Sequence, residues 1–185
     1  LTHRTRPDIL LACNFLSIQI EHPTQKSLQD LDRVVGYLSR TRGRGLRYTK
    51  VEKPRVLFYT DAAYACHFDA KGHTGVVGGI GEDPGEQSWE QPGDTPKLNP
   101  VFFRSVKQKL VSRSSTESEL TAVHDTYPKL HWVNDLVREM SNLEMAIPIL
   151  YQDNISTIVS AAQGLQRFNK MLSLIHISEP TRQLQ

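Results

Sequence analysis

The fold is decided by Arg55-Val-Leu-Phe-Tyr-Thr60, a short run rich in apolar, β-branched and aromatic residues that ends directly before Asp61. Such residues favour the extended conformation, so the run predicts a strand with an acid at its end. Upstream of Lys50 the apolar residues recur at helical spacing instead, so the periodicity changes at this point. A sheet-containing domain is therefore expected to begin near residue 51.

Three further strands and two helices are expected downstream. The strands are Val76–Ile80, Val101–Lys107 and Ile147–Tyr151, and the helices are Ser115–Met140 and Ser156–Ala162. The first three strands suggest an antiparallel meander, whereas the helix between the third and fourth strands favours a parallel addition to the sheet. The sequence thus predicts an α/β domain with a mixed sheet in the order β-β-β-α-β-α, flanked by helices.

Two local features of this domain carry expectations of their own. The strand at Val76–Ile80 is rich in glycine, which indicates that another group approaches it closely. Pro128 removes one backbone hydrogen bond from the long helix, so a kink or two helices meeting there are expected. Proline and glycine are frequent in 82–100, which predicts a long loop.

Residues 1–50 are expected to form a small helical segment in front of the sheet. Pro7-Asp8 is suited to a helix start, because proline tolerates the first turn and an acid stabilises the positive end of the helix dipole. A second helix is expected over Ser27–Ser39, ending near Gly43. Two short helices form a hairpin that is too small to be stable alone.

The composition indicates an ordinary globular protein. Of its 185 residues, 38% are hydrophobic and 23% are charged, and the formal net charge of +2 is too small to predict a nucleic-acid partner. The longest apolar run, Ile9–Cys13, is far shorter than the roughly 20 residues that span a membrane. The two cysteines have no metal-ligand spacing, which favours free thiols.

Three carboxylates occupy positions that suit a metal site. Asp61 ends the first strand, Asp153 follows the fourth, and Glu119 lies in the first turns of the long helix. If the first and fourth strands are neighbours, both aspartates lie at one edge of the sheet, where sites of open α/β sheets gather. Three oxygen ligands suit a hard cation such as Mg²⁺.

Each acid also has an ordinary structural explanation. Asp61 could begin a turn, and Glu119 could close a capping box with Thr116. Asp153-Asn154 could cap the short helix that follows. On spacing alone, both explanations stay open for all three residues.

Several ordered motifs resemble copia-type retrotransposon polyproteins over roughly residues 2 to 170. Tyr59-Thr-Asp-Ala-Ala-Tyr64 is similar to the first ribonuclease H strand of that family, and Lys71-Gly-His-Thr-Gly75 resembles its turn into the second strand. Ser105-Val-Lys-Gln-Lys109 with Ser114-Ser-Thr-Glu-Ser-Glu-Leu120 is the most specific likeness, and Gln152-Asp-Asn154 resembles the third motif. The resemblance places the catalytic and metal-binding roles on Asp61, Glu119 and Asp153.

The resemblance implies a ribonuclease H-like fold and a metal-dependent endonuclease that hydrolyses the RNA strand of RNA–DNA hybrids during reverse transcription. It implies two Mg²⁺ or Mn²⁺ ions, no small-molecule cofactor and no membrane. Residues 1–50 would be a reverse transcriptase connection segment, and the partner would be the reverse transcriptase domain of the same polyprotein in a cytoplasmic virus-like particle. Lys107, Lys109 and Arg113 are expected to contact hybrid phosphates, although a solvated basic face explains them equally well.

The sequence departs from the family in two places. The loop over 82–100 is longer than expected. After Met171 the family continues with a basic-histidine motif, whereas this chain reads Leu172-Ser-Leu-Ile-His-Ile-Ser-Glu-Pro-Thr-Arg182, which looks like a translated sequencing adapter. We hypothesise that the ribonuclease H-like domain, 51–171, is truncated and that 172–185 is not native. Resequencing the genomic locus across codon 171 tests this, and a locus that encodes the tail refutes it.

The truncation leaves a second functional hypothesis open. In that alternative the chain is an inactive remnant, acting only as a connection or nucleic-acid-binding module. An integrase core of the same fold is disfavoured by the Ser114–Leu120 motif and the helical segment before the sheet. His73 and His124 could act as acid–base groups, but a turn histidine and a helix-face histidine are more often structural.

Overall fold

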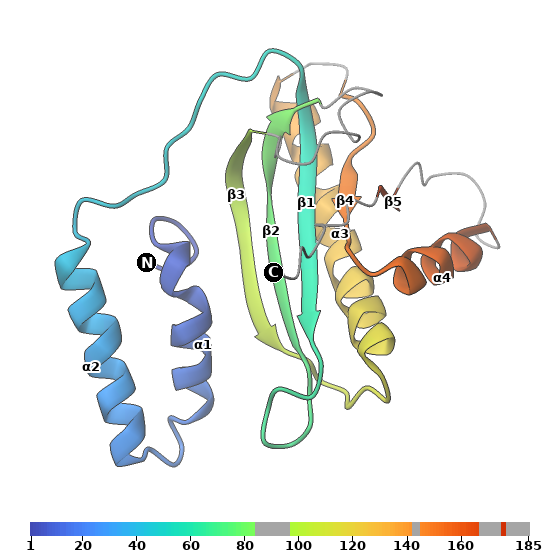
Figure 1. The fold of residues 1–185 in the computed structure, drawn as a ribbon. Helices are drawn as coiled ribbons and strands as arrows, with labels where there is room; N and C mark the ends of the chain where they lie inside the picture. Colours follow the sequence, from blue (N-terminus) through green and yellow to red (C-terminus); the bar gives the residue numbers. More distant parts are fainter. Residues whose placement is uncertain (84–96, 142–144, 167–174, 177–185) are drawn as a thin grey trace, which may run out of the picture.

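A five-stranded mixed sheet in the order β3-β2-β1-β4-β5 forms the centre of the described chain (Figure 1). The computed structural model describes residues 1–83, 97–141, 145–166 and 175–176. The strands are β1 Pro54–Ala63, β2 His73–Glu82, β3 Leu98–Lys107, β4 Ile149–Tyr151 and β5 Ile175–His176. The first three pair antiparallel, while β4 joins β1 in parallel and β5 joins β4 in parallel. The α/β class and the mixed sheet expected from the sequence are confirmed.

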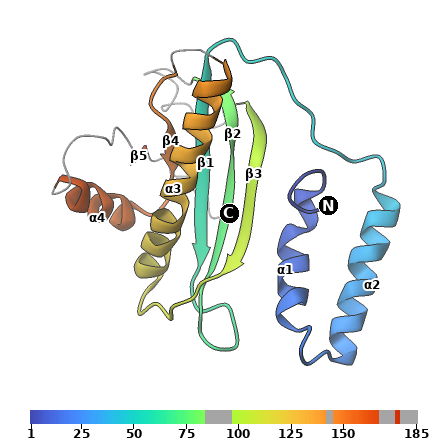
Figure 2. The same cartoon turned by 180° about the vertical axis from the view of Figure 1, so that it is seen from behind.

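The parallel addition of β4 follows from the long helix that precedes it. The helix α3, Ser115–Ser141, crosses one face of the sheet between β3 and β4, behind the sheet in Figure 1 and in front of it in Figure 2. It continues through Pro128 as a single helix, so of the two expected alternatives the meeting of two helices is wrong, while a kink at Pro128 stays a prediction. Packing against the sheet holds the helix together where one backbone hydrogen bond is lost. The last helix, α4, covers Ile155–Gln166.

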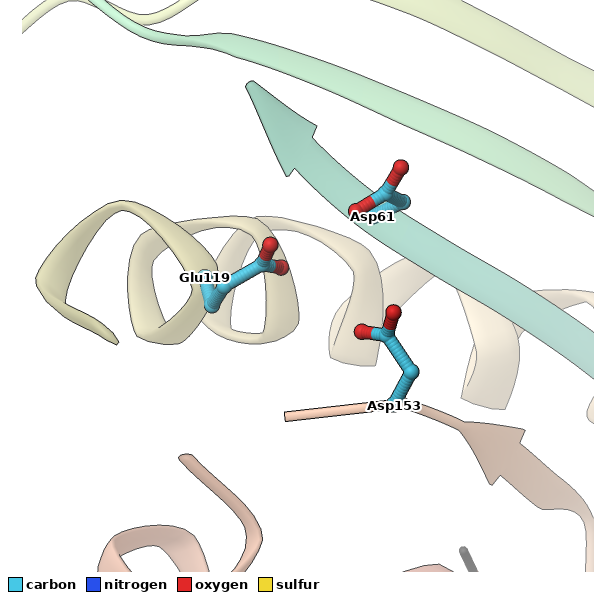
Figure 3. Close-up of side chains that lie close together, drawn as sticks. All are labelled: Asp61, Glu119 and Asp153. Carbon is cyan, nitrogen blue, oxygen red and sulfur yellow. The ribbon is translucent and has the colours of Figure 1, made fainter. Parts of the chain in front are cut away.

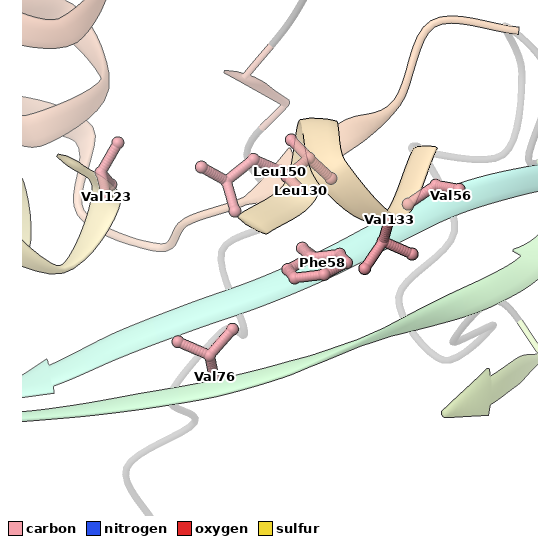
Figure 4. Close-up of a cluster of buried hydrophobic side chains, with 7 residues drawn as sticks. All are labelled: Val56, Phe58, Val76, Val123, Leu130, Val133 and Leu150. Atoms are coloured by element: carbon pink, nitrogen blue, oxygen red, sulfur yellow. The ribbon is translucent and has the colours of Figure 1, made fainter. Parts of the chain in front are cut away.

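The main core lies between α3 and the sheet. Strand residues alternate between the two faces, so Val56 and Phe58 of β1 point toward α3, whereas Leu57 points away and packs with Ile149 and Tyr151. Both faces of β1 are therefore covered, which explains its unbroken apolar run. Figure 4 shows the cluster on the α3 side, formed by Val56, Phe58, Val76, Val123, Leu130, Val133 and Leu150.

The glycines of β2 leave room for this core. A Cβ atom added at Gly78 would collide with the ring of Phe58, which packs across that strand. The expectation that a neighbouring group approaches β2 closely is confirmed, and at Gly78 the neighbour is the Phe58 side chain.

The N-terminal residues form a helical hairpin that packs beside β3 (Figures 1 and 2). A 3-10 turn, η1 Pro7–Ile9, leads into α1 Leu10–Ile18, and α2 Gln25–Arg40 follows. Arg6 connects the start of the hairpin with the end of α2. Its guanidinium donates to Asp8 at 2.9 and 3.0 Å and to the Thr41 carbonyl at 3.0 Å.

Aromatic contacts attach this hairpin to the sheet. The ring of Phe15 on α1 stacks on His67 and His73, with ring centroids 4.8 and 5.2 Å apart. His3 Nδ1 lies 3.1 Å from the Phe103 carbonyl of β3. The helices expected within residues 1–50 are present, and they pack on the sheet.

Two expectations from the sequence fall mostly outside the described residues. These are the long loop, of which 84–96 is not described, and the non-native tail, of which the structure describes β5 alone. Among the described helices, none has both the length and the apolar surface needed to cross a lipid bilayer.

Candidate metal centre

The register between β1 and β4 brings two of the expected acids to one place. Tyr59 pairs with Tyr151 as the last parallel pair, and their rings stack at 4.4 Å between centroids. Asp61 and Asp153 each lie two residues beyond this pair, so they project from the sheet at the same level. Because β4 ends at Tyr151 while β1 continues along β2, the edge of β1 beside Asp61 is open for another side chain.

Glu119 reaches this edge from α3. It lies in the second turn of the helix, and Figure 3 shows its carboxylate pointing toward those of Asp61 and Asp153. Each of the three residues offers one oxygen, and these oxygens all lie within 4.8 Å of one another. The structure thus brings together the three acids that the sequence singled out, from β1, α3 and the segment after β4.

Neighbouring residues perform two of the structural roles that the sequence left open for these acids. The first turn of α3 is capped by Ser114 and Glu117: the Glu117 N–H donates to Ser114 Oγ at 3.2 Å, and Glu117 accepts from the Arg113 N–H at 2.6 Å. At α4, Asn154 Oδ1 accepts from the Thr157 N–H at 3.0 Å. The capping contacts at these two helices therefore use neither Glu119 nor Asp153.

Asp61 does not begin a turn either. It lies within β1, opposite Gly75 of β2, and its Oδ1 accepts from the Ala62 N–H at 2.8 Å. Its side chain is exposed, as is that of Asp153. Since both carboxylates reach solvent, a ligand can approach the cluster from their side.

Glu119 is the buried member of the cluster, with 7% of its surface exposed. Burial raises the pKa of its carboxyl to about 7, a hydrogen bond from Gln152 opposes this shift, and the negative charge of Asp61 adds to it. Three carboxylates held this close repel one another, and a cation between them relieves the repulsion. The donor set therefore fits a hard divalent metal ion.

A buried glutamine that sequence reasoning missed anchors the start of α3. Gln108, just after β3, donates through Nε2 to Thr74 Oγ1 at 3.0 Å and to the Ser118 carbonyl at 2.9 Å. Its Oε1 accepts from Ser118 Oγ at 2.9 Å, and its N–H donates to the Gly72 carbonyl at 2.8 Å. This network ties the turn before Glu119 to β2. The signal available in the sequence was the position of Gln108 within the motif Ser105-Val-Lys-Gln-Lys109.

A second buried glutamine touches the acids directly. Gln152 Nε2 donates to Glu119 Oε2 at 2.9 Å, and its Oε1 accepts from the Asp153 N–H at 2.8 Å. Sequence reasoning assigned it no role, although its place in the motif Gln152-Asp-Asn154 was an available signal.

The expected basic residues lie in or beside the connection from β3 to α3. Lys107 forms an ion pair with Asp69 at 2.8 Å, so its charge is partly compensated. Lys109 and Arg113 are exposed. The Tyr64 hydroxyl donates to the Arg113 carbonyl at 3.4 Å, which holds this connection near the end of β1 that carries Asp61. Contact with phosphates stays a prediction for all three.

The two histidines lie outside the acid cluster. His73 is buried and its Nε2 lies 2.7 Å from Ser105 Oγ, while its Nδ1 lies 3.0 Å from His67 Nε2. Burial lowers the pKa of His73, which favours a neutral ring that packs against α1. His124 is exposed on α3, with Nδ1 3.7 Å from an Asp125 carboxylate oxygen. These surroundings favour the structural explanation for His73.

Comparison with known proteins gives relatives by sequence only. The chain is 32% identical over 152 residues, 82% of its length, to the Retrovirus-related Pol polyproteins from transposons RE1 and RE2 of Arabidopsis thaliana. It spans 9% of the length of each. It is also 30% identical over 131 residues to Secreted RxLR effector protein 161 of Plasmopara viticola, covering 70% of this chain and 80% of that protein. No family model matches the chain. No solved structure matches it.

Proposed function

Because this chain belongs with the Pol polyproteins of retrotransposons, of which it spans one short segment, we propose that it is their ribonuclease H domain with a preceding connection segment. Its reaction would be endonucleolytic hydrolysis of the RNA strand of an RNA–DNA hybrid during reverse transcription. The observation that carries the proposal is the convergence of Asp61, Glu119 and Asp153, whose oxygens lie within 4.8 Å of one another. The mixed sheet with α3 on one face is compatible with a ribonuclease H-like fold.

The three acids would hold two Mg²⁺ or Mn²⁺ ions. When bound, such ions activate a water molecule and stabilise the leaving oxygen of an in-line phosphodiester displacement. Asp61 and Asp153 present their carboxylates on the exposed side, where a substrate phosphate can complete the ligand set. Glu119 supplies its oxygens from the buried side, where the ends of β4 and α3 keep bulk water away.

Lys109 and Arg113 would contact the hybrid backbone, with Lys107 beside them. Their connection lies near the end of β1 that carries Asp61, so a duplex whose phosphate meets the acid cluster would pass within reach of these cations. Such contacts position a duplex without reading its sequence, which suits an enzyme that removes RNA of any sequence.

The helical hairpin would face the reverse transcriptase domain of the same polyprotein, in a cytoplasmic virus-like particle. Its helix α2 leaves Leu28, Leu31 and Val35 about half exposed along one side. Apolar residues in a row on a helix favour contact with another apolar surface. Residues 1–50 would then be the connection segment and 51–171 the nuclease domain.

The decisive experiment is a cleavage assay on a labelled RNA–DNA hybrid with Mg²⁺, comparing the full chain with Asp61→Asn. Cleavage of the RNA strand should require both the metal and Asp61, while hybrid binding should survive the substitution. Glu139→Gln, on the exposed side of α3, serves as a charge-matched control that keeps activity. A folded wild-type chain that binds the hybrid without cutting it would refute the proposed nuclease activity and support the alternative of a non-catalytic module.

A further inference from the structure

The side chain of Gln152 forms hydrogen bonds to two members of the acid cluster, Glu119 and Asp153. It is 3% exposed and lies between the end of β4 and the second turn of α3. One end of its carboxamide donates to Glu119 Oε2 at 2.9 Å. The other end accepts from the N–H groups of Asp153 at 2.8 Å and Asn154 at 3.4 Å. The same planar group therefore sets the direction of the Glu119 carboxylate and the path of the backbone into Asp153.

A neutral amide is suited to this place. A lysine or arginine would neutralise Glu119 and compete with a metal ion for its charge, whereas an amide holds one carboxylate oxygen and leaves the charge intact. Gln152 holds Glu119 Oε2, and the Glu119 carboxylate as a whole points toward those of Asp61 and Asp153 (Figure 3). Long side chains lose considerable freedom on being ordered, and here the protein orders Glu119 before any ion arrives.

The backbone contacts extend this effect to Asp153. The parallel pairing of β4 with β1 ends at Tyr151, and the chain leads from there through Gln152 into α4. By accepting from two successive N–H groups, Gln152 Oε1 holds this turn in one conformation. The side chain of Asp153 consequently points to the side of the turn on which Glu119 lies (Figure 3).

We propose that Gln152 is a positioning residue that holds Glu119 and Asp153 in the arrangement that binds a divalent cation. This inference rests on the proposed function, since it assumes that the acids bind metal. Residues that orient metal ligands typically contribute 10- to 100-fold to metal affinity, so the loss of Gln152 should weaken binding by about tenfold or more.

The test uses Mn²⁺ as the probe and the full chain as the protein. Gln152→Met keeps the length of the side chain but removes its donor and acceptor, and Gln25→Met makes the same change at an exposed position in α2. Free Mn²⁺ is followed by electron paramagnetic resonance during titration, and thermal unfolding is recorded without metal. We expect the affinity for Mn²⁺ to fall about tenfold in Gln152→Met and to stay unchanged in Gln25→Met.

Two further measurements separate positioning from a general loss of structure. Cleavage by Gln152→Met should recover as Mn²⁺ is raised, because the acids are all present, whereas Asp61→Asn should not recover. If Gln152→Met melts well below the wild type, Gln152→Asn replaces it, since that amide is one methylene too short to span from the Asp153 N–H to Glu119. We expect the same loss of Mn²⁺ affinity in it.

The outcomes distinguish this inference from the proposed function. Wild-type affinity for Mn²⁺ in both Gln152 variants overturns the positioning role, and a wild-type chain that still cleaves hybrid leaves the proposed function standing. A wild-type chain that neither binds Mn²⁺ nor cleaves overturns both.

Discussion

Replacing Glu119 by glutamine should stabilise the metal-free protein at alkaline pH. The wild-type carboxyl has a pKa of about 7 in the folded chain against an ordinary value of 4.5, mainly because it is buried. A shift of one pKa unit corresponds to about 1.4 kcal/mol, so ionising this group in the folded state costs on the order of 3 kcal/mol. Glutamine has nearly the same shape and carries no charge, so it avoids this cost.

The sign of the pH dependence follows from proton counts. Between pH 4.5 and pH 7 the folded protein holds a proton on Glu119 that the unfolded chain has lost, so the free energy of unfolding falls as the pH rises through this window. Above pH 7 both states are ionised and the penalty is complete. Glu119→Gln should therefore match the wild type near pH 4.5 and exceed it by on the order of 3 kcal/mol at pH 8.

The assay is equilibrium unfolding in denaturant with a metal chelator present, at pH 4.5 and pH 8. Glu139→Gln on the exposed side of α3 is the control, and it should show little difference at either pH. Adding Mn²⁺ should stabilise the wild type and not Glu119→Gln, because an ion that binds only the folded state shifts unfolding by mass action. A Glu119→Gln protein that is less stable than the wild type at pH 8, or whose difference does not change with pH, would refute this account of the cluster.

Three other predictions address the scaffold and the substrate. Gly72→Ala should destabilise the fold by about 1–3 kcal/mol, because its Cβ would collide with the buried network that anchors α3, whereas Gly43→Ala meets nothing within 4 Å; urea unfolding of both measures the difference. The Arg6 guanidinium, hydrogen-bonded to Asp8, lowers the pKa of that carboxyl from its ordinary value of 3.8 to about 2. The ion pair therefore stabilises the hairpin above pH 3.8, and this stabilisation is lost as the pH falls toward 2. The melting temperature of Asp8→Asn should lie below that of the wild type at pH 6 and approach it at pH 2, and a gap of constant size would count against the pair. Alanine at Lys109 and Arg113 should weaken hybrid binding for all sequences alike and reduce the slope of log affinity against log salt by about 1 per residue, and an unchanged slope would remove both from the interface.

Local patterns were sufficient to locate most elements of this protein, but not β5. The run around Phe58 predicts β1, the helical spacing after Ser114 predicts α3, and the apolar run before Asp153 predicts β4. Such patterns depend on residues close together in the chain, where side-chain periodicity reports directly which face is buried. Strand and helix ends were less certain, since pairing with β2 extends β1 to Ala63, beyond the apolar run.

The choice between neighbouring acids needed more than local pattern. Glu117 and Glu119 stand two residues apart at the start of α3, so they point to opposite sides of the helix. Only the packing of α3 on the sheet decides that Glu119 faces the cluster while Glu117 caps the helix. The resemblance to a family selected Glu119 in advance, and the spacing of the residues by itself did not.

The sequence by itself determined the α/β class, most of the elements and the two acids that follow strands, because hydrophobic periodicity and strand-end acids are local properties of the chain. Only the tertiary structure decided how the acids meet, since the pairing of Tyr59 with Tyr151 sets Asp61 and Asp153 at one level. It alone revealed Gln108 and Gln152, whose side-chain hydrogen bonds to Thr74, Ser118 and Glu119 join residues 10 to 34 positions apart. Contacts of this range arise from how the elements pack on one another, and no pattern along the chain records them.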